Sequence, residues 1–328
     1  LHEYLQEMNR ETFGRKDLLT VGECWGATPE IGRLYSDPAR HELSMIFQFE
    51  QIQLDKQPGG HRWDLKPLEL PELKAVFNKW QQELEGHGWN SLFWSNHDLP
   101  RIVSRWGNDR EYRVESAKML ATVLHGMKGT PYIYQGEELG MTNVPFSSPD
   151  DFTDVESRNV CAERRAAGYA EADILASLQA KARDNARTPM QWNATAQAGF
   201  TTGTPWYPVN PNYTAINAEQ ALADENSIFY YYQALIALRK TQPILTQGSF
   251  EPLLPDDPDI YAYLRRWNGK TWLVVCNFHQ KQVTFCGKGR GRTILSNYPQ
   301  PELADLQQLS LRPYEATIYE ILEGEESS

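Results

Sequence analysis

The chain has 328 residues, of which 41% are hydrophobic and 12% aromatic, so it can bury a sizeable core and is long enough for one large domain plus a smaller one. Its 43 acidic and 32 basic residues give a net charge of −11, which argues against nucleic acid and anionic membrane surfaces as partners. The four cysteines lack a paired short spacing, and no His/Cys cluster or membrane-length apolar run occurs, so we expect a reduced, cytoplasmic protein without a metal centre or cofactor.

The sequence begins at Leu1 and not at Met, inside a helical pattern. Leu1, Leu5 and Met8 mark one apolar face, no capping residue precedes them, and the helix is expected to break at Gly14. This start predicts that the chain is the later part of a longer one.

A short buried strand is predicted over residues 18–21, and Glu23 follows it directly, beside Trp25. Apolar surroundings disfavour the charged form of a carboxyl group, so Glu23 is a candidate general acid. The alternative is that Glu23 caps the helix that begins near Pro29. Glu is an unusual capping residue, and catalysis is therefore the favoured interpretation.

Alternation of strand, loop and helix continues along the chain. Strands are predicted over 43–50, 91–94 and 130–134, and helices over 73–84 and 112–127. Polar groups follow the C-terminal end of each strand. This rhythm is typical of a parallel α/β fold and fits one half of a (β/α)8 TIM barrel, which alone would leave two unpaired edges.

The most informative of these polar segments follows the strand over 91–94. Asn96, His97 and Asp98 come directly after a buried aromatic run, and Pro100 ends any extended pairing. Such a run is poor core material and suits a site at the end of a barrel strand. The alternative is a satisfied turn in which Asp98 caps the next segment.

A long polar insertion begins near Phe146 and contains Glu156. A charged helix then leads into a segment with Arg183, Asp184 and Arg187. Two arginines four residues apart, with an Asp between them, suit a clamp on hydroxyls or carboxylates. The alternative, a solvated helix end with ordinary ion pairs, is favoured when this segment is considered alone.

The last third of the chain has a different pattern. A helix over 227–240 closes the first domain, and short strands separated by turns follow from Gly248. They predict an antiparallel β-sandwich. The expected division is 1–245 for the half barrel, 246–322 for the sandwich and 323–328 for a disordered Glu-rich tail.

Several motifs resemble the α-amylase family of glycoside hydrolases: Val21-Gly22-Glu23, Asn96-His97-Asp98, the run 129–138 and the run 183–192. The last run resembles the oligo-1,6-glucosidase branch. Within it, the runs 22–30 and 96–101 are similar to glucan 1,6-α-glucosidases (dextran glucosidases), with trehalose-6-phosphate hydrolases next. The resemblance covers essentially the whole chain.

The resemblance implies the following roles. Glu23 would be the general acid/base on the fifth barrel strand, and Asp98, on the seventh, would hold the hydroxyls of the sugar with His97 beside it. Arg183 would recognise the terminal glucose, while Arg187 would be structural. Trp25, Arg62 and Glu156 would shape the site for the leaving sugar, and Trp25 would favour α-1,6 linkages. Such enzymes retain configuration through a covalent glycosyl-enzyme.

The sequence lacks several motifs that are typical of the family. The Gly-x-Arg-x-Asp motif that carries the nucleophile does not occur, nor do the first-strand motifs or the loop that binds calcium in this branch. We therefore expect a fragment, inactive alone, whose missing half belongs either to the same longer chain or to a partner chain. The calcium site, where the parent has one, would lie in that half.

Three functions remain open. The first is release of glucose from the non-reducing end of α-1,6-linked glucans and isomalto-oligosaccharides. The second is hydrolysis of trehalose 6-phosphate, which needs a cationic pocket. The third is a non-catalytic family member, although such relatives usually lose the acid/base Glu, whereas Glu23, His97 and Asp98 are all present.

Overall fold

A computed structural model describes residues 1–16 and 18–322. Its N-terminal part contains short parallel strands in chain order. Strand β1 (Val21–Glu23) pairs with β2 (Met45–Phe47), and β3 (Ser91–Phe93) pairs with β4 (Thr130–Tyr132). A parallel bridge between Ile46 and Asn90 joins the two pairs. The expected half of a (β/α)8 barrel is therefore present.

Helices separate these strands, as the apolar spacing predicted. Helix α2 (Pro29–Ser36) follows β1, α3 (Leu70–Glu83) follows β2, and α4 (Ile102–Trp106) and α5 (Arg113–His125) follow β3. Helix α9 (Ile228–Thr241) begins after its N-cap Ser227, whose side chain accepts a hydrogen bond from the Tyr230 amide. Phe77 and Trp80 of α3 are 2% exposed, which confirms that this aromatic stripe is core.

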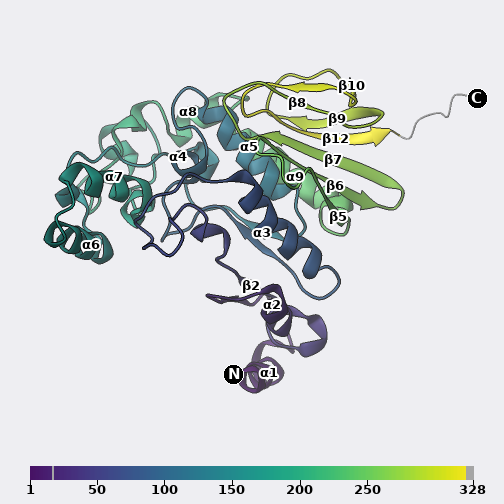
Figure 1. The fold of residues 1–328 in the computed structure, drawn as a ribbon, viewed down its shortest axis with the longest axis horizontal. Helices are drawn as coiled ribbons and strands as arrows, with labels where there is room; N and C mark the ends of the chain where they lie inside the picture. Colours follow the sequence, from purple (N-terminus) through teal and green to yellow (C-terminus); the bar gives the residue numbers. More distant parts are fainter. Residues whose placement is uncertain (17, 323–328) are drawn as a thin grey trace, which may run out of the picture.

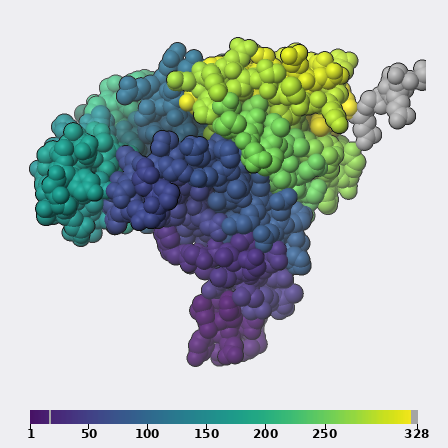
Figure 2. Space-filling view, in the orientation of Figure 1, coloured from purple at the N-terminus to yellow at the C-terminus, as the bar shows by residue number. Residues whose placement is uncertain are grey.

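The N-terminal segment projects from the rest of the molecule (Figures 1 and 2). Helix α1 (His2–Met8) continues into a π-helical turn (Asn9–Phe13) and ends at Gly14, as expected. The buried strand predicted over 18–21 is wrong: β1 begins only at Val21, and Leu18 and Leu19 are more than half exposed. In the described residues β1 pairs only with β2, and Thr20 bonds to Ser44 instead of extending the ladder.

The insertion after β4 forms a helical unit with its own small core. Helices α6 (Val155–Ala166) and α7 (Glu171–Lys181) pack around Phe152, Ile174 and Leu178. A 3₁₀ helix, η6 (Arg183–Ala186), follows α7, and α8 (Ala218–Ala223) precedes α9.

The C-terminal region is an antiparallel sheet of strand order β10-β9-β12-β7-β6-β5, covered on one face by a β8–β11 ribbon. Its strands are β5 (Ser249–Leu253), β6 (Ile260–Trp267), β7 (Lys270–Asn277), β8 (Val283–Phe285), β9 (Arg290–Ser296), β10 (Leu303–Asp305), β11 (Leu309–Leu311) and β12 (Ala316–Leu322). The sequence pattern missed β5, β10 and β11. The second layer of the predicted sandwich is thus only the β8–β11 ribbon.

The sheet's other face lies against α5 and α3, and residues of α9 belong to the same hydrophobic core, to which both parts of the chain contribute (Figure 1). The predicted domain boundary, between residues 245 and 246, falls between a 3₁₀ turn (Pro243–Leu245) and β5. It stays a prediction, and the predicted disordered tail, 323–328, lies outside the described residues. No described helix combines the length and the apolar character that crossing a membrane would require.

Candidate active site

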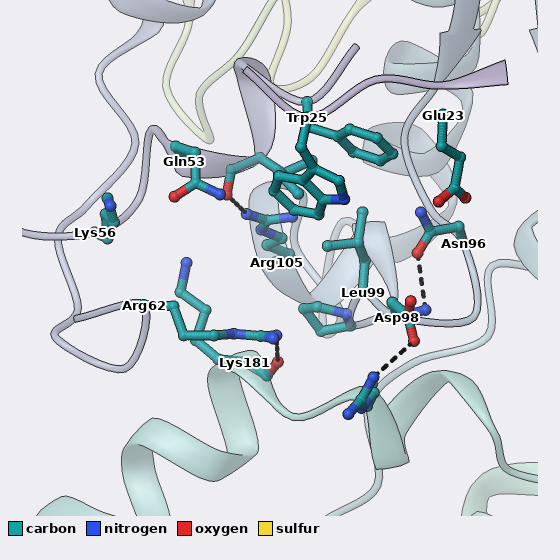
Figure 3. A pocket seen from close by; sticks show the side chains of 14 residues that line it. Glu23, Trp25, Gln53, Lys56, Arg62, Asn96, Asp98, Leu99, Arg105 and Lys181 are labelled. Carbon is teal, nitrogen blue, oxygen red and sulfur yellow. Dashed lines mark hydrogen bonds and ion pairs between the residues drawn. The ribbon is translucent and has the colours of Figure 1, made fainter. Parts of the chain in front are cut away.

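A pocket with a volume of about 310 Å³ lies where the chain leaves β1, β2 and β3, and Arg183 at the start of η6 also lines it (Figure 3). The carboxyl ends of parallel strands meet at one end of a barrel, which explains why residues distant in sequence converge there. The side chains that line it are Glu23, Trp25, Phe49, Ile52, Gln53, Lys56, Arg62, Asn96, Asp98, Leu99, Pro100, Arg105, Lys181 and Arg183.

Glu23 is the last residue of β1 and lines this pocket. Its backbone is fixed by the parallel register with Phe47. The alternative that Glu23 caps the next helix is wrong, because the N-cap of α2 is Thr28, whose side chain accepts from the Ile31 amide. Among the described residues Glu23 is exposed, so the apolar enclosure expected around it stays a prediction for the longer protein.

Trp25 stands beside Glu23 at the pocket wall (Figure 3). Gly26 follows with φ +72°, a left-handed conformation that allows the chain to turn sharply after the strand. The Trp25 ring stacks on the buried Phe49 ring, with 4.3 Å between centroids and 11° between planes. One Trp25 face is thus held by Phe49, and the side chain remains 65% exposed.

Asp98 lies in a tight turn after β3, where its amide donates to Asn96 Oδ1 at 2.8 Å. The expected alternative, a cap, is wrong: the N-cap of α4 is Arg101, and Asp98 instead accepts from Arg183 and Arg187. Burial would raise the pKa of the Asp98 carboxyl, but the Arg183 hydrogen bond and the charges of His97, Arg183 and Arg187 lower it overall. The group is thus held as a carboxylate.

The two arginines of the 183–187 segment share two carboxylates. Arg183 Nη1 and Arg187 Nη2 lie 3.1 and 2.8 Å from the same Asp98 oxygen. Both also bind Asp154, at 2.9 and 2.8 Å. Arg183 lines the pocket, whereas Arg187 stands behind Asp98 and donates to the His97 carbonyl. The different roles expected for the two arginines stay a prediction.

The structure brings most other predicted residues to the same place. Arg62 lines the pocket and donates from Nη1 to both oxygens of Glu156 at 2.8 Å. Glu156 supports Arg62 and also lies 3.5 Å from Arg183 Nη2, but it does not line the pocket. The His97 side chain is 64% exposed, 3.4 Å from the Asp98 carboxylate, and does not line the pocket either.

Sequence reasoning missed a buried ion cluster in the wall of the pocket. Asp55 accepts two hydrogen bonds of 2.7 Å from Arg105 and also contacts Lys181. Burial would raise the pKa of Asp55, but these two cations bring it down to about 2. The three residues come from distant segments, so no local sequence pattern predicts this cluster. Phe49, by contrast, follows β2 and could have been found by the rule that located Glu23.

The described ranges, 1–16 and 18–322, contain no group of three His, Cys, Asp or Glu side chains that could hold a metal ion. Glu50, which follows β2, is not available to a metal or a ligand, because it pairs with Lys79 at 2.6 Å. What the pocket presents is therefore a set of carboxylates, cations and aromatic rings of a kind suited to a polyhydroxylated ligand.

Comparison with known proteins agrees with this geometry. Residues 1–248 match the family model for the alpha amylase catalytic domain, and residues 250–318 match that for the maltogenic amylase C-terminal domain. The chain is 55% identical to an oligo-1,6-glucosidase of Halalkalibacterium halodurans over 97% of its length, and 51% identical to a glucan 1,6-alpha-glucosidase of Streptococcus pneumoniae over 98%. It spans 58% and 60% of these two relatives.

Solved structures give the same picture. The trehalose-6-phosphate hydrolase of Bacillus licheniformis superposes with a TM-score of 0.94 at 46% identity, over 98% of this chain and 59% of that one. The isomaltulose synthase of Klebsiella sp. LX3 superposes with a TM-score of 0.92 at 38% identity, over 97% and 58%. The motifs, the half barrel with its C-terminal sheet and these matches lead to one conclusion: the chain belongs to the alpha-amylase family.

Proposed function

We propose that the protein containing this chain is a retaining α-glucosidase that releases glucose from the non-reducing end of α-1,6-linked glucans and isomalto-oligosaccharides. One observation carries the proposal: Glu23 ends one barrel strand, Asp98 follows another, and both line one pocket. The names of similar proteins, oligo-1,6-glucosidase and glucan 1,6-alpha-glucosidase, support the same substrate class.

In this proposal Glu23 protonates the glycosidic oxygen and later activates the water that completes hydrolysis. Asp98, kept as a carboxylate by Arg183 and Arg187, accepts hydrogen bonds from the sugar hydroxyls and binds more tightly as the ring flattens. The exposed face of Trp25, backed by Phe49, is a platform for the leaving sugar.

The nucleophile that the resemblance implies is not assigned to any residue of this chain, so turnover is proposed for the full-length protein. Replacing Glu23 by Gln there is expected to lower kcat for isomaltose by about 100-fold or more, because the protonating group is lost. Steady-state kinetics with isomaltose give the measurement. The matched control is Glu50→Gln, a carboxyl after β2 that pairs with Lys79 outside the pocket. Near-normal turnover by Glu23→Gln would remove Glu23 from the mechanism.

Hydrolysis of trehalose 6-phosphate is the second candidate, because Lys56, Arg62 and Lys181 line the pocket. Arg62 is paired with Glu156, and Lys181 with Asp55. In the part of the chain that the structure describes, Lys56 has no ion pair. One free cation gives weak support for a phosphate site, so glucans are favoured.

Comparing kcat/KM for isomaltose with that for trehalose 6-phosphate decides between the two substrates. Isomaltose is expected to be the better one, and Lys56→Ala is expected to change its hydrolysis little. A preference for trehalose 6-phosphate that Lys56→Ala abolishes would reverse the assignment.

A further inference from the structure

A second cavity lies behind the turn that carries Asp98. The space open to the centre of a water molecule there is about 10 Å³, enough for about one water. Its polar lining includes Ser95, Arg101, Glu137 and Tyr232, each at most 6% exposed. None of its lining residues lines the main pocket.

By hydrogen-bond geometry, three polar atoms of this lining have no partner among the described residues: Ser95 Oγ, Arg101 Nη2 and Glu137 Oε2. The Ser95 hydroxyl nevertheless lies close enough to the Glu137 carboxyl to lower its pKa, so the two side chains face the same space. The other ends of two of these side chains are engaged. Arg101 donates from Nε to the Asn185 carbonyl and from Nη1 to the Gln135 carbonyl. Glu137 Oε1 accepts from the Tyr232 hydroxyl at 2.9 Å. Buried polar atoms are rarely left unpaired, so three around one cavity indicate a shared ligand.

We propose that Ser95, Arg101 and Glu137 bind one internal water molecule, and that this water fixes the turn that carries Asp98. The binding site follows from the cavity and its lining alone. The effect on catalysis rests on the proposed function.

The chemistry of the lining favours water over an ion. The Arg101 guanidinium would repel a cation, and Glu137 together with Glu138 would repel an anion. Water can accept from Arg101 Nη2 and donate to Ser95 Oγ and Glu137 Oε2, which gives it the usual three partners. Burial raises the pKa of Glu137 to about 7, and a water suits both states of that carboxyl because it can accept as well as donate.

The position of the cavity explains why its water would affect the geometry of Asp98. Ser95 precedes the Asp98 turn and Arg101 follows it, so the water would hold both sides of the turn. Arg101 also binds the carbonyl of Asn185 in η6, the helix that supplies Arg183 to Asp98. A displaced water would therefore loosen both partners of the Asp98–Arg183 contact. The three lining residues act as positioning residues and touch no substrate.

The test uses crystal structures of the full-length protein and of its Ser95→Val variant, whose branched apolar side chain fills the cavity. In the natural protein we expect one water within about 3.2 Å of all three atoms. In Ser95→Val we expect no water there and a lengthened Asp98–Arg183 contact, which is 3.1 Å in the natural chain. Direct pairing of the three side chains, or an unmoved Asp98, would overturn the proposal.

Kinetics with isomaltose supply the second readout. Ser95→Val is expected to lower kcat by about 100-fold with less than a threefold change in KM, since a displacement near 1 Å costs about that much in rate. Ser95→Ala, which keeps the room for water, should fold even where Ser95→Val does not, and should lose about threefold to tenfold. The matched control is Ser91→Ala: Ser91 is a buried β3 serine whose hydroxyl is also unpaired in the described chain but lies outside the cavity.

If Ser91→Ala and Ser95→Ala changed kcat equally, the role of Ser95 would be merely structural, and the proposal that it positions Asp98 would be contradicted. Should the natural protein hydrolyse no α-glucoside, the proposed function fails. The water site and the shift of Asp98 would still be decided by the two crystal structures.

Discussion

Glu137 shows how a single carboxyl group in this chain depends on its surroundings. It is fully enclosed, and burial raises its pKa from 4.5 to about 7, assisted by the charge of Glu138 and opposed by hydrogen bonds from Tyr232, the Tyr134 backbone and Ser95. Between these two pH values the folded protein binds more protons than the unfolded one. Stability contributed by the protonated group is therefore complete below pH 4.5 and is lost as the pH rises through 7.

Replacing Glu137 by Gln is expected to remove this pH dependence, because Gln is similar in size and cannot ionise. Between pH 5 and 8 the free energy of unfolding should fall by about 2 to 3 kcal/mol more in the natural protein than in the variant. Urea denaturation at several pH values measures the difference. Glu163→Gln, at an exposed position of α6, is the control and should follow the natural protein. Parallel curves for the natural protein and Glu137→Gln would contradict the prediction.

The candidate site was partly predictable at the level of residues. Glu23 and Asp98 were found because each follows a predicted strand, and the barrel rule places strand ends together. The exposure of Glu23 was not predicted, since it depends on which segments pack against β1. Asp154 could not be recognised either: its role as the second carboxylate for Arg183 and Arg187 arises from the path of the insertion. Contacts of this kind leave no local pattern.

Among the secondary structure elements, α3 is tied to the C-terminal sheet by one buried lysine. Lys74 is 0% exposed, and its Nζ donates to the carbonyls of Leu254 and Asp257 at 2.6 Å and of Ile260 at 3.0 Å. Leu254 has a left-handed backbone with φ of 50°, which is unfavourable for a Leu and needs support from such contacts. Lys74 thus secures the turn between β5 and β6.

Replacing Lys74 by Met is expected to lower the free energy of unfolding by about 3 to 5 kcal/mol, because one buried and two part-buried carbonyls lose their donor. Amide exchange over residues 254–260 should accelerate as well. Lys79→Met provides the control on the same helix. Lys79 pairs with Glu50 near the surface, and its loss should cost less than about 1 kcal/mol. Equal decreases in the free energy of unfolding for the two variants would contradict the claim that Lys74 stabilises the turn between β5 and β6.

Helices were easier to predict than strands, and the reason is physical. The apolar spacing of α3, α5 and α9 is repeated over several turns within each helix, so the pattern is visible locally. Strand β5 contains Glu251 and Pro252 and pairs on one side only, as the edge of its sheet. Strands β10 and β11 have three residues each, too few for a periodic signal. Their existence depends on partners elsewhere in the chain.

On the scale of the whole molecule, the half barrel and the C-terminal sheet share one core. The main hydrophobic cluster includes Leu120 and Leu124 of α5, Leu235 of α9 and Val274 of β7. The Tyr263 hydroxyl donates to the Val123 carbonyl across the same boundary at 2.7 Å. Val275, the next residue of β7, faces the opposite way, into the smaller core under the β8–β11 ribbon. Sequence composition separates the two parts, but their packing joins them.

We therefore expect the two parts to unfold as one cooperative unit. A substitution in the core under the β8–β11 ribbon should then also destabilise α5. Val275→Ala removes two buried methyl groups far from the helices and should cost about 2 kcal/mol. Hydrogen exchange measures the opening free energy of α5 and β7 separately, and both should fall by this same amount. Val274→Ala, on the face toward α5, is the matched variant and should give the same equal decrease. If α5 kept its full protection in Val275→Ala while β7 lost protection, the sheet would open without the barrel, and the shared core would not be enough to couple them.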